Sequence, residues 1–123
     1  MADLNCEVYY TGYVAQSPPE DTPPAGEDLA SLSQDEPMIV ASVGGGRNGY
    51  QMLKALVEAS SSLETRLPHK IYAFTGPFMA EAEFLQLQTM AAGGIVTIRR
   101  FTPHLIDYMS KAELSISLAG YNT

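Results

Sequence analysis

The fold of this chain is indicated by one stretch, "PMIVASVGGGRNGYQMLKALVEASSSLETRL" (residues 37–67). Its first seven residues form a nearly continuous apolar run, which is typical of a parallel strand buried on both faces. Four glycines within residues 44–49 then predict a sharp turn. The apolar residues of the next segment are spaced to share one face of a helix that ends before Pro68: Leu53, Leu56, Val57, Leu63 and Leu67. The stretch therefore predicts a strand, a turn and a helix in that order.

The same unit recurs along the rest of the chain. The further predicted elements are strands at 70–76, 95–100 and 114–120 and helices at 77–92 and 103–112. Proline at the start of the first of these helices is typical of a first turn, and a Gly-Gly pair follows its end. This alternation predicts an α/β fold with a Rossmann-like, doubly wound parallel sheet. In the usual strand order the first and fourth strands are neighbours, so loops 44–49 and 119–123 would open into one crevice.

The first 37 residues have a different character. Residues 6–14, "CEVYYTGYV", are rich in aromatic and β-branched residues and predict a strand. Residues 15–37 contain five prolines and much of the acidic charge, which is typical of a linker. A strand that precedes a long linker has no local partner, so it would belong to another sheet or add to an edge. We therefore expect a strand within residues 1–14, a linker at 15–37 and an α/β domain at 38–123.

Charge and composition exclude several classes of protein. The net charge is −7, and residues 1–37 hold eight acidic residues without any Lys or Arg, whereas residues 38–123 hold six acidic and seven basic residues. Neither part has the basic excess that a nucleic-acid-binding surface needs. The apolar runs are shorter than a membrane span requires. The single cysteine, Cys6, cannot form an internal disulfide, which fits a reducing compartment, and we expect a cytoplasmic protein.

The glycine loop is the first candidate binding element. Residues 44–49, "GGGRNG", satisfy the pattern G-x-G-x-x-G between a predicted strand and helix, where backbone N–H groups attract a phosphate. A tight turn alone would explain the glycines equally well. A dinucleotide site also expects an acidic residue at the end of the second strand, but that strand ends in "AFTGP" (73–77). No Walker lysine follows the glycines either, which disfavours a nucleotide-hydrolysing P-loop.

Other polar groups offer weaker signals. Residues 119–123, "AGYNT", combine a glycine and an aromatic ring with side chains that cap helices and bind ligands. The only two histidines are His69 and His104, and they lie far apart without ligand spacing to a carboxylate, so we expect no metal site. Glu81 and Glu83 suit a helical first turn. The pair Arg99-Arg100 ends the third strand, where one arginine could meet a phosphate, although a solvated strand end is the simpler interpretation.

Three segments together resemble a known family: "IVASVGGGRNGY" (39–50), "FTGPFM" (74–79) and "VTIRRFTPHLIDYMSKAELSISLAGYNT" (96–123). They resemble the C-terminal domain of family 28 glycosyltransferases, especially a bacterial branch related to the enzyme that adds GlcNAc in peptidoglycan synthesis. The similarity covers about residues 38–123, and "YYTGYV" (9–14) resembles the segment that crosses between the two domains. The resemblance implies one half of a GT-B fold, whose C-terminal domain binds most of the nucleotide-sugar donor. Residues 1–14 would then be an interdomain strand or crossover, and residues 38–123 a partial nucleotide-sugar-binding domain.

The resemblance also implies which residues bind a UDP-sugar. The glycine loop would lie beside the diphosphate, the backbone at the end of the third strand would meet the base, and the last loop would hold the diphosphate and sugar: Gly44, Gly45, Gly46, Asn48 and Gly49; Phe101 and Thr102; Gly120, Tyr121, Asn122 and Thr123. The acidic residue that holds the ribose would follow Thr123. An N-terminal acceptor domain would be the partner and would supply the catalytic base.

We therefore expect a fragment of a hexosyltransferase that carries the donor-binding loops but no catalytic residue, metal ligand or cofactor. The isolated chain would be inactive, because transfer requires base, acceptor and donor to be held together. The last predicted strand would have poorly covered faces, so self-association through the sheet edge is also expected. Two alternatives remain, a non-catalytic nucleotide-binding or interaction module and a dehydrogenase-type cofactor domain.

Overall fold

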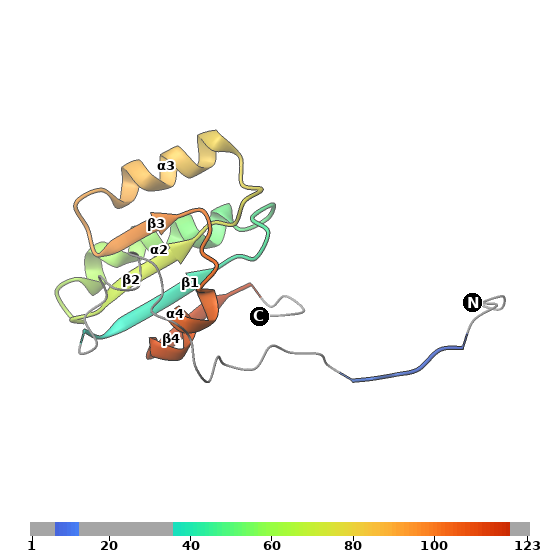
Figure 1. Ribbon diagram of the computed structural model, residues 1–123. Helices are drawn as coiled ribbons and strands as arrows, with labels where there is room; N and C mark the ends of the chain where they lie inside the picture. Colours follow the sequence, from blue (N-terminus) through green and yellow to red (C-terminus); the bar gives the residue numbers. More distant parts are fainter. Residues whose placement is uncertain (1–6, 13–35, 119–123) are drawn as a thin grey trace.

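The computed structural model describes residues 7–12 and 36–118, and within them strands and helices alternate (Figure 1). The elements are β1 (Met38–Ser42), α2 (Tyr50–Leu63), β2 (Lys70–Phe74), α3 (Glu81–Ala91), β3 (Val96–Arg99), α4 (Leu105–Lys111) and β4 (Leu114–Ser117). The strands form one parallel sheet in the order β3-β2-β1-β4. The predicted α/β, Rossmann-like fold is confirmed, and so is the expectation that the first and fourth strands are neighbours.

Helices cover both faces of the sheet, and β1 shows why. Its five residues are all buried. Ile39 and Ala41 belong to the larger core, which contains α2 and α3 side chains, whereas Met38 and Val40 pack with Tyr108 of α4. Successive strand side chains point to opposite faces, so a strand between two helical layers must be apolar at every position. In Figure 1, α2 and α3 accordingly lie on one side of the sheet and α4 on the other.

The bounds of α3 differ from the predicted helix. That helix was expected to begin at Pro77, but α3 begins at Glu81, and residues 77–80 form a turn instead. The Phe78 N–H donates a hydrogen bond to the Gly45 carbonyl oxygen at 2.9 Å, and the Met79 side chain is buried. These contacts with another loop hold the segment out of the helix, so the prediction of proline in a helical first turn was wrong.

The strand predicted at residues 6–14 is not paired in the part of it that the structure describes. Residues 7–12 belong to neither a helix nor a strand, and the side chains of Val8, Tyr9 and Tyr10 are exposed. Cys6 and residues 13–14 lie outside the described residues, as does the predicted linker up to residue 35. In the described part of the chain, no helix combines the length and the apolar character needed to cross a membrane.

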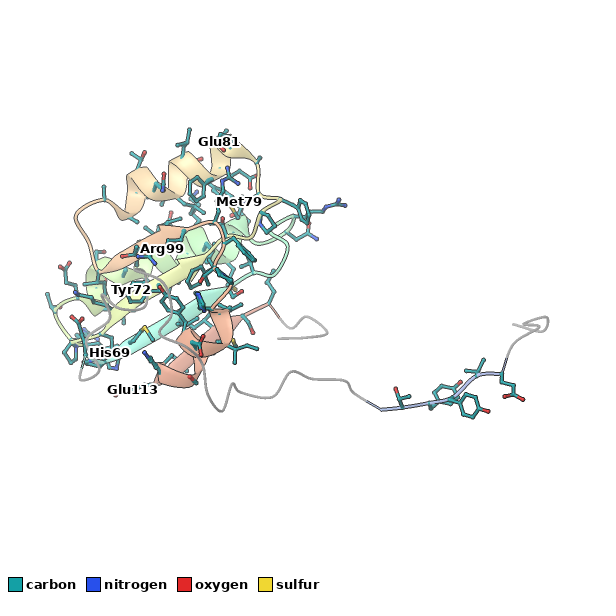
Figure 2. The ribbon with its side chains drawn as sticks, viewed as in Figure 1. His69, Tyr72, Met79, Glu81, Arg99 and Glu113 are labelled. Atoms are coloured by element: carbon teal, nitrogen blue, oxygen red, sulfur yellow. The ribbon has the colours of Figure 1, made fainter. Side chains whose placement is uncertain are left out.

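Side chains at the amino ends of the strands connect elements that are distant in sequence. The His69 Nε2 and Glu113 Oε2 atoms lie 2.6 Å apart, so the residue before β2 contacts the residue before β4 (Figure 2). Lys70 Nζ lies 3.1 Å from Glu36 Oε1. The hydrogen bond to Glu36 and its negative charge raise the pKa of the Lys70 ammonium group above its ordinary value. These contacts lie at the amino ends of the strands, which is the end of the sheet opposite the glycine loop.

Candidate functional site

The glycine loop is tightly packed against its surroundings. Gly44 and Gly46 have positive φ angles of 64° and 94°, which are unfavourable for other residues. Gly46 is also buried, and a Cβ atom there would lie 2.2 Å from the Thr75 carbonyl oxygen. A Cβ atom on Gly49 would lie 2.2 Å from the Val43 Cβ. Close packing therefore explains why residues 46 and 49 are glycines. Like the interpretation of the loop as a tight turn, this explanation needs no bound ligand.

A second loop fits against the first. Residues 75–79 follow β2, and a Cβ atom on Gly76 would lie 2.2 Å from the Gly44 carbonyl oxygen. The Gly76 N–H donates to the Arg100 carbonyl oxygen at 2.8 Å, and the Thr75 N–H donates to the Arg99 carbonyl oxygen at 2.9 Å. The carboxyl ends of β1, β2 and β3 are thus joined by backbone contacts, which fix the three loops relative to one another.

A pocket of about 150 Å³ opens between these three loops and α4. It lies over the carboxyl ends of the parallel strands, which is where ligands bind in open α/β sheets. Its wall consists mostly of backbone and apolar side chains, with hydroxyl groups and one guanidinium group as the polar members: Ser42, Gly44, Phe74, Gly76, Pro77, Arg100, Phe101, Thr102 and Leu105. The pocket is therefore a half-open, mostly apolar hollow with a few hydrogen-bonding groups in its wall.

The structure brings three of the predicted donor-binding residues into the pocket wall. Gly44, Phe101 and Thr102 come from loops that are far apart in the sequence and meet at this place. Gly45 and Asn48 are exposed in the glycine loop, outside the pocket wall, whereas Gly46 and Gly49 are buried beneath it. The predicted residues Gly120, Tyr121, Asn122 and Thr123 lie outside the described residues.

Arg100, which the sequence suggested as a possible phosphate contact, also lies in the pocket wall, but sequence reasoning missed the remaining wall residues. Ser42, Phe74 and Gly76 lie at or just after the carboxyl ends of β1 and β2. Their positions at the ends of predicted parallel strands were a usable signal, since the ends of neighbouring strands meet at one edge. Leu105 lies at the start of α4, and only the packing of that helix against the sheet brings it to the pocket.

Both arginines at the end of β3 contact other residues of the chain. Arg99 Nη1 donates to the Tyr108 hydroxyl oxygen at 2.9 Å, and its guanidinium lies 5.7 Å from the Tyr72 ring centroid (Figure 2). Arg100 Nη1 donates to the Met79 carbonyl oxygen at 3.0 Å, and Arg100 Nη2 pairs with Glu81. The interpretation of this pair as a solvated strand end was therefore wrong. Within the pocket, the charge of Arg100 is balanced by the Glu81 carboxylate.

Replacing Arg100 by alanine should lower the free energy of unfolding by about 1–2 kcal/mol, because the guanidinium donates to a carbonyl oxygen and is partly exposed. It also lies 4.3 Å from the Phe84 ring centroid. Urea unfolding followed by circular dichroism measures the change. Arg47→Ala is a matched control, since this exposed arginine lies 5.9 Å from the Phe78 ring centroid. Equal losses in the two variants would show that the Arg100 contacts contribute nothing specific.

The described residues of the pocket wall include no acidic side chain and no histidine. This described wall therefore lacks the carboxylate that would hold the ribose of NAD. In residues 7–12 and 36–118, no three His, Cys, Asp or Glu side chains lie together as a metal site would require. The N-terminus of α2 has no side-chain cap, which leaves first-turn N–H groups open to an anion beside the glycine loop.

Comparisons with family models, with curated proteins and with solved structures find no match to this chain.

Proposed function

We propose that this chain binds the nucleotide part of a nucleotide-sugar donor and corresponds to the donor-binding part of a hexosyltransferase. The observation that carries the proposal is the pocket at the carboxyl ends of β1, β2 and β3, where Gly44 meets Phe101 and Thr102. These three residues belong to two segments that resemble the donor-binding loops of family 28 glycosyltransferases. A second loop expected to bind the donor, residues 119–123, follows β4, which lies next to β1.

The size of the pocket suits one part of such a donor. Pockets that enclose a whole drug-sized ligand measure about 300–1,000 Å³, so a pocket of about 150 Å³ has room for a single ring system. A nucleobase has two flat apolar faces and a polar edge. Phe101 and Leu105 would contact its faces, and the Thr102 backbone would contact its edge. The diphosphate would then extend toward Gly44 and the N-terminus of α2.

The role proposed for this chain is donor binding without sugar transfer. Transfer needs a base and an acceptor held beside the donor, and the pocket wall contains neither Asp, Glu nor His. A non-catalytic nucleotide-binding module would have the same pocket chemistry, so donor binding is the part of the proposal that this chain can test directly.

Titration of the full chain with uridine diphosphate, followed by NMR, tests the proposal. We expect the amide signals of Gly44, Gly76 and Thr102 to shift together and to saturate. Phe101→Ala should weaken binding about tenfold, because stacking of one base on an aromatic ring is worth about 1–3 kcal/mol. Leu85→Ala removes a comparably exposed apolar side chain from α3 and serves as the control with unchanged affinity.

Two results would contradict the proposal. One is the absence of any saturable shift with uridine diphosphate. The other is an equal loss of affinity in the Phe101 and Leu85 variants, which would show that uridine diphosphate does not bind in the pocket. A parallel titration with NAD distinguishes the dehydrogenase alternative, since saturable binding of NAD without binding of uridine diphosphate would favour that class.

A further inference from the structure

The outer edge of β4 is the least covered part of the sheet. Within the described residues, β4 pairs with β1 alone. Leu114 and Leu118 expose 53% and 37% of their surface, and none of the four strand residues is buried. The opposite edge strand, β3, differs, since its apolar residues Val96 and Ile98 are buried in the core that includes α3. An added strand would therefore cover apolar surface at β4 and little at β3.

The exposed apolar residues of β4 form one row. Ile116 lies opposite Ala41 in the register of β1 and β4, and both contact the core on the α2 and α3 side. Because strand side chains alternate, Leu114 and Leu118 lie on the same face as Ile116. The free backbone edge and this apolar row together match what β-strand addition requires: hydrogen-bonding groups for the backbone and contacts for alternate side chains.

Residues 7–12 have the properties of the missing strand. Val8, Tyr9 and Tyr10 favour strands, yet they expose 56%, 77% and 97% of their surface. The Tyr9 hydroxyl donates to the Glu7 carboxylate at 2.7 Å, which places side chains two residues apart on one side, as in extended backbone. Val8 and Tyr10 then share the other side. In Figure 1 this segment lies clear of the sheet.

The connection between the two parts is long enough for them to meet. Residues 13–37 separate the segment from β1, and a connection of 25 residues can reach at most about 80–90 Å. The outer side of β4 is two strand spacings from β1, or roughly 10 Å. An antiparallel arrangement places Gly12 near the amino end of β4, close to where the connection reaches Met38. Antiparallel edge strands on otherwise parallel sheets are common.

We propose that residues 7–12 of this chain add to the free edge of β4 as an antiparallel fifth strand. Val8 and Tyr10 cover the apolar row formed by Leu114, Ile116 and Leu118. Occupation is intramolecular, because a tether of this length gives the segment an effective concentration of about millimolar at its own sheet edge. This inference concerns a surface separate from the nucleotide pocket and does not depend on the proposed function.

Hydrogen–deuterium exchange of the full chain at low micromolar concentration tests the proposal, with sedimentation velocity on the same samples. We expect residues 8–11 and 114–117 to exchange at least about tenfold more slowly than peptides from residues 15–35 in a monomeric chain. Tyr10→Pro removes a backbone donor and should abolish the protection of residues 8–11, whereas residues 114–117 should keep only the protection that pairing with β1 gives. Residues 38–42 should remain protected, which shows that the sheet is still folded. Gln16→Pro is the control and should change neither segment.

Two outcomes overturn the proposal. Fast exchange of residues 8–11 in the unsubstituted chain would show that the segment does not add to the sheet. Protection that appears only with rising concentration and a dimeric sedimentation coefficient would assign the edge to a second copy of the chain.

Discussion

Replacing Gly46 by alanine is expected to remove a large part of the stability of this domain. The new Cβ atom would lie 2.2 Å from the Thr75 carbonyl oxygen and 3.0 Å from the Met79 nitrogen, and both neighbours are backbone atoms. The positive φ of 94° adds strain for any side chain. We expect a loss of about 3–5 kcal/mol, out of the roughly 5–15 kcal/mol that is usual for folded domains. Urea unfolding followed by circular dichroism measures the loss.

The neighbouring glycines provide matched controls for Gly46. A Cβ atom on Gly45 would be 3.4 Å from the Phe78 ring, which is an ordinary contact, and Gly45 has no positive φ. The Cβ atom of Gly44→Ala would lie in open space, so the positive φ of 64° is its only source of strain. This strain should lower the free energy of unfolding by about 1 kcal/mol. The expected order of destabilisation is Gly46, then Gly44, then Gly45. Similar losses at Gly45 and Gly46 would contradict the close approach of the two loops.

The second large effect is expected at Tyr108, where alanine should lower the free energy of unfolding by about 3–5 kcal/mol. This side chain is completely buried in the small core between α4 and the sheet. Its ring centroid lies 5.0 Å from that of Phe74 and 5.5 Å from that of Tyr72. Loss of the ring should loosen α4 and with it the pocket wall at Leu105. The same variant is therefore expected to bind uridine diphosphate more weakly in the NMR titration.

Tyr108→Phe separates the ring from its hydroxyl group. This variant keeps both aromatic contacts and loses the hydrogen bond that Arg99 donates to the hydroxyl oxygen at 2.9 Å. Its cost should be about 1–2 kcal/mol, and α4 should stay in place. A phenylalanine variant as unstable as the alanine variant would mean that the hydrogen bond, and not the packing of the ring, holds α4 on the sheet.

Local sequence patterns accounted for most of the fold. The apolar run at residues 38–42, the glycine turn and the helical spacing of Leu53 and Val57 each predict one element from neighbouring residues. The order of the strands followed from a general rule about parallel sheets. Two predictions differ from the structure at places where distant contacts decide the outcome. Residues 77–80 are held in a turn by the glycine loop, and residues 7–12 have strand-forming side chains without a paired strand beside them.

The candidate site was only partly predictable. Gly44, Phe101 and Thr102 line the pocket as expected of residues near strand ends, and donor binding by them stays a prediction. Gly46 and Gly49 were chosen because they belong to a glycine motif, but a Cβ atom on either would collide with the protein itself. The partners of Arg99 and Arg100 come from α4 and the turn before α3, and no spacing rule in the sequence connects them.

The sequence by itself determined that this chain forms alternating strands and helices around a parallel sheet with a glycine turn after the first strand. Those features depend on side-chain periodicity and on backbone freedom, which act over a few residues. Only the tertiary structure decided that the loops after β1, β2 and β3 lock together around a pocket. It also decided that the charge of Arg100 is balanced by the carboxylate of Glu81, and that one edge of β4 is unpaired within the described residues. Such features depend on which distant residues meet, and this is fixed when the helices pack on the sheet.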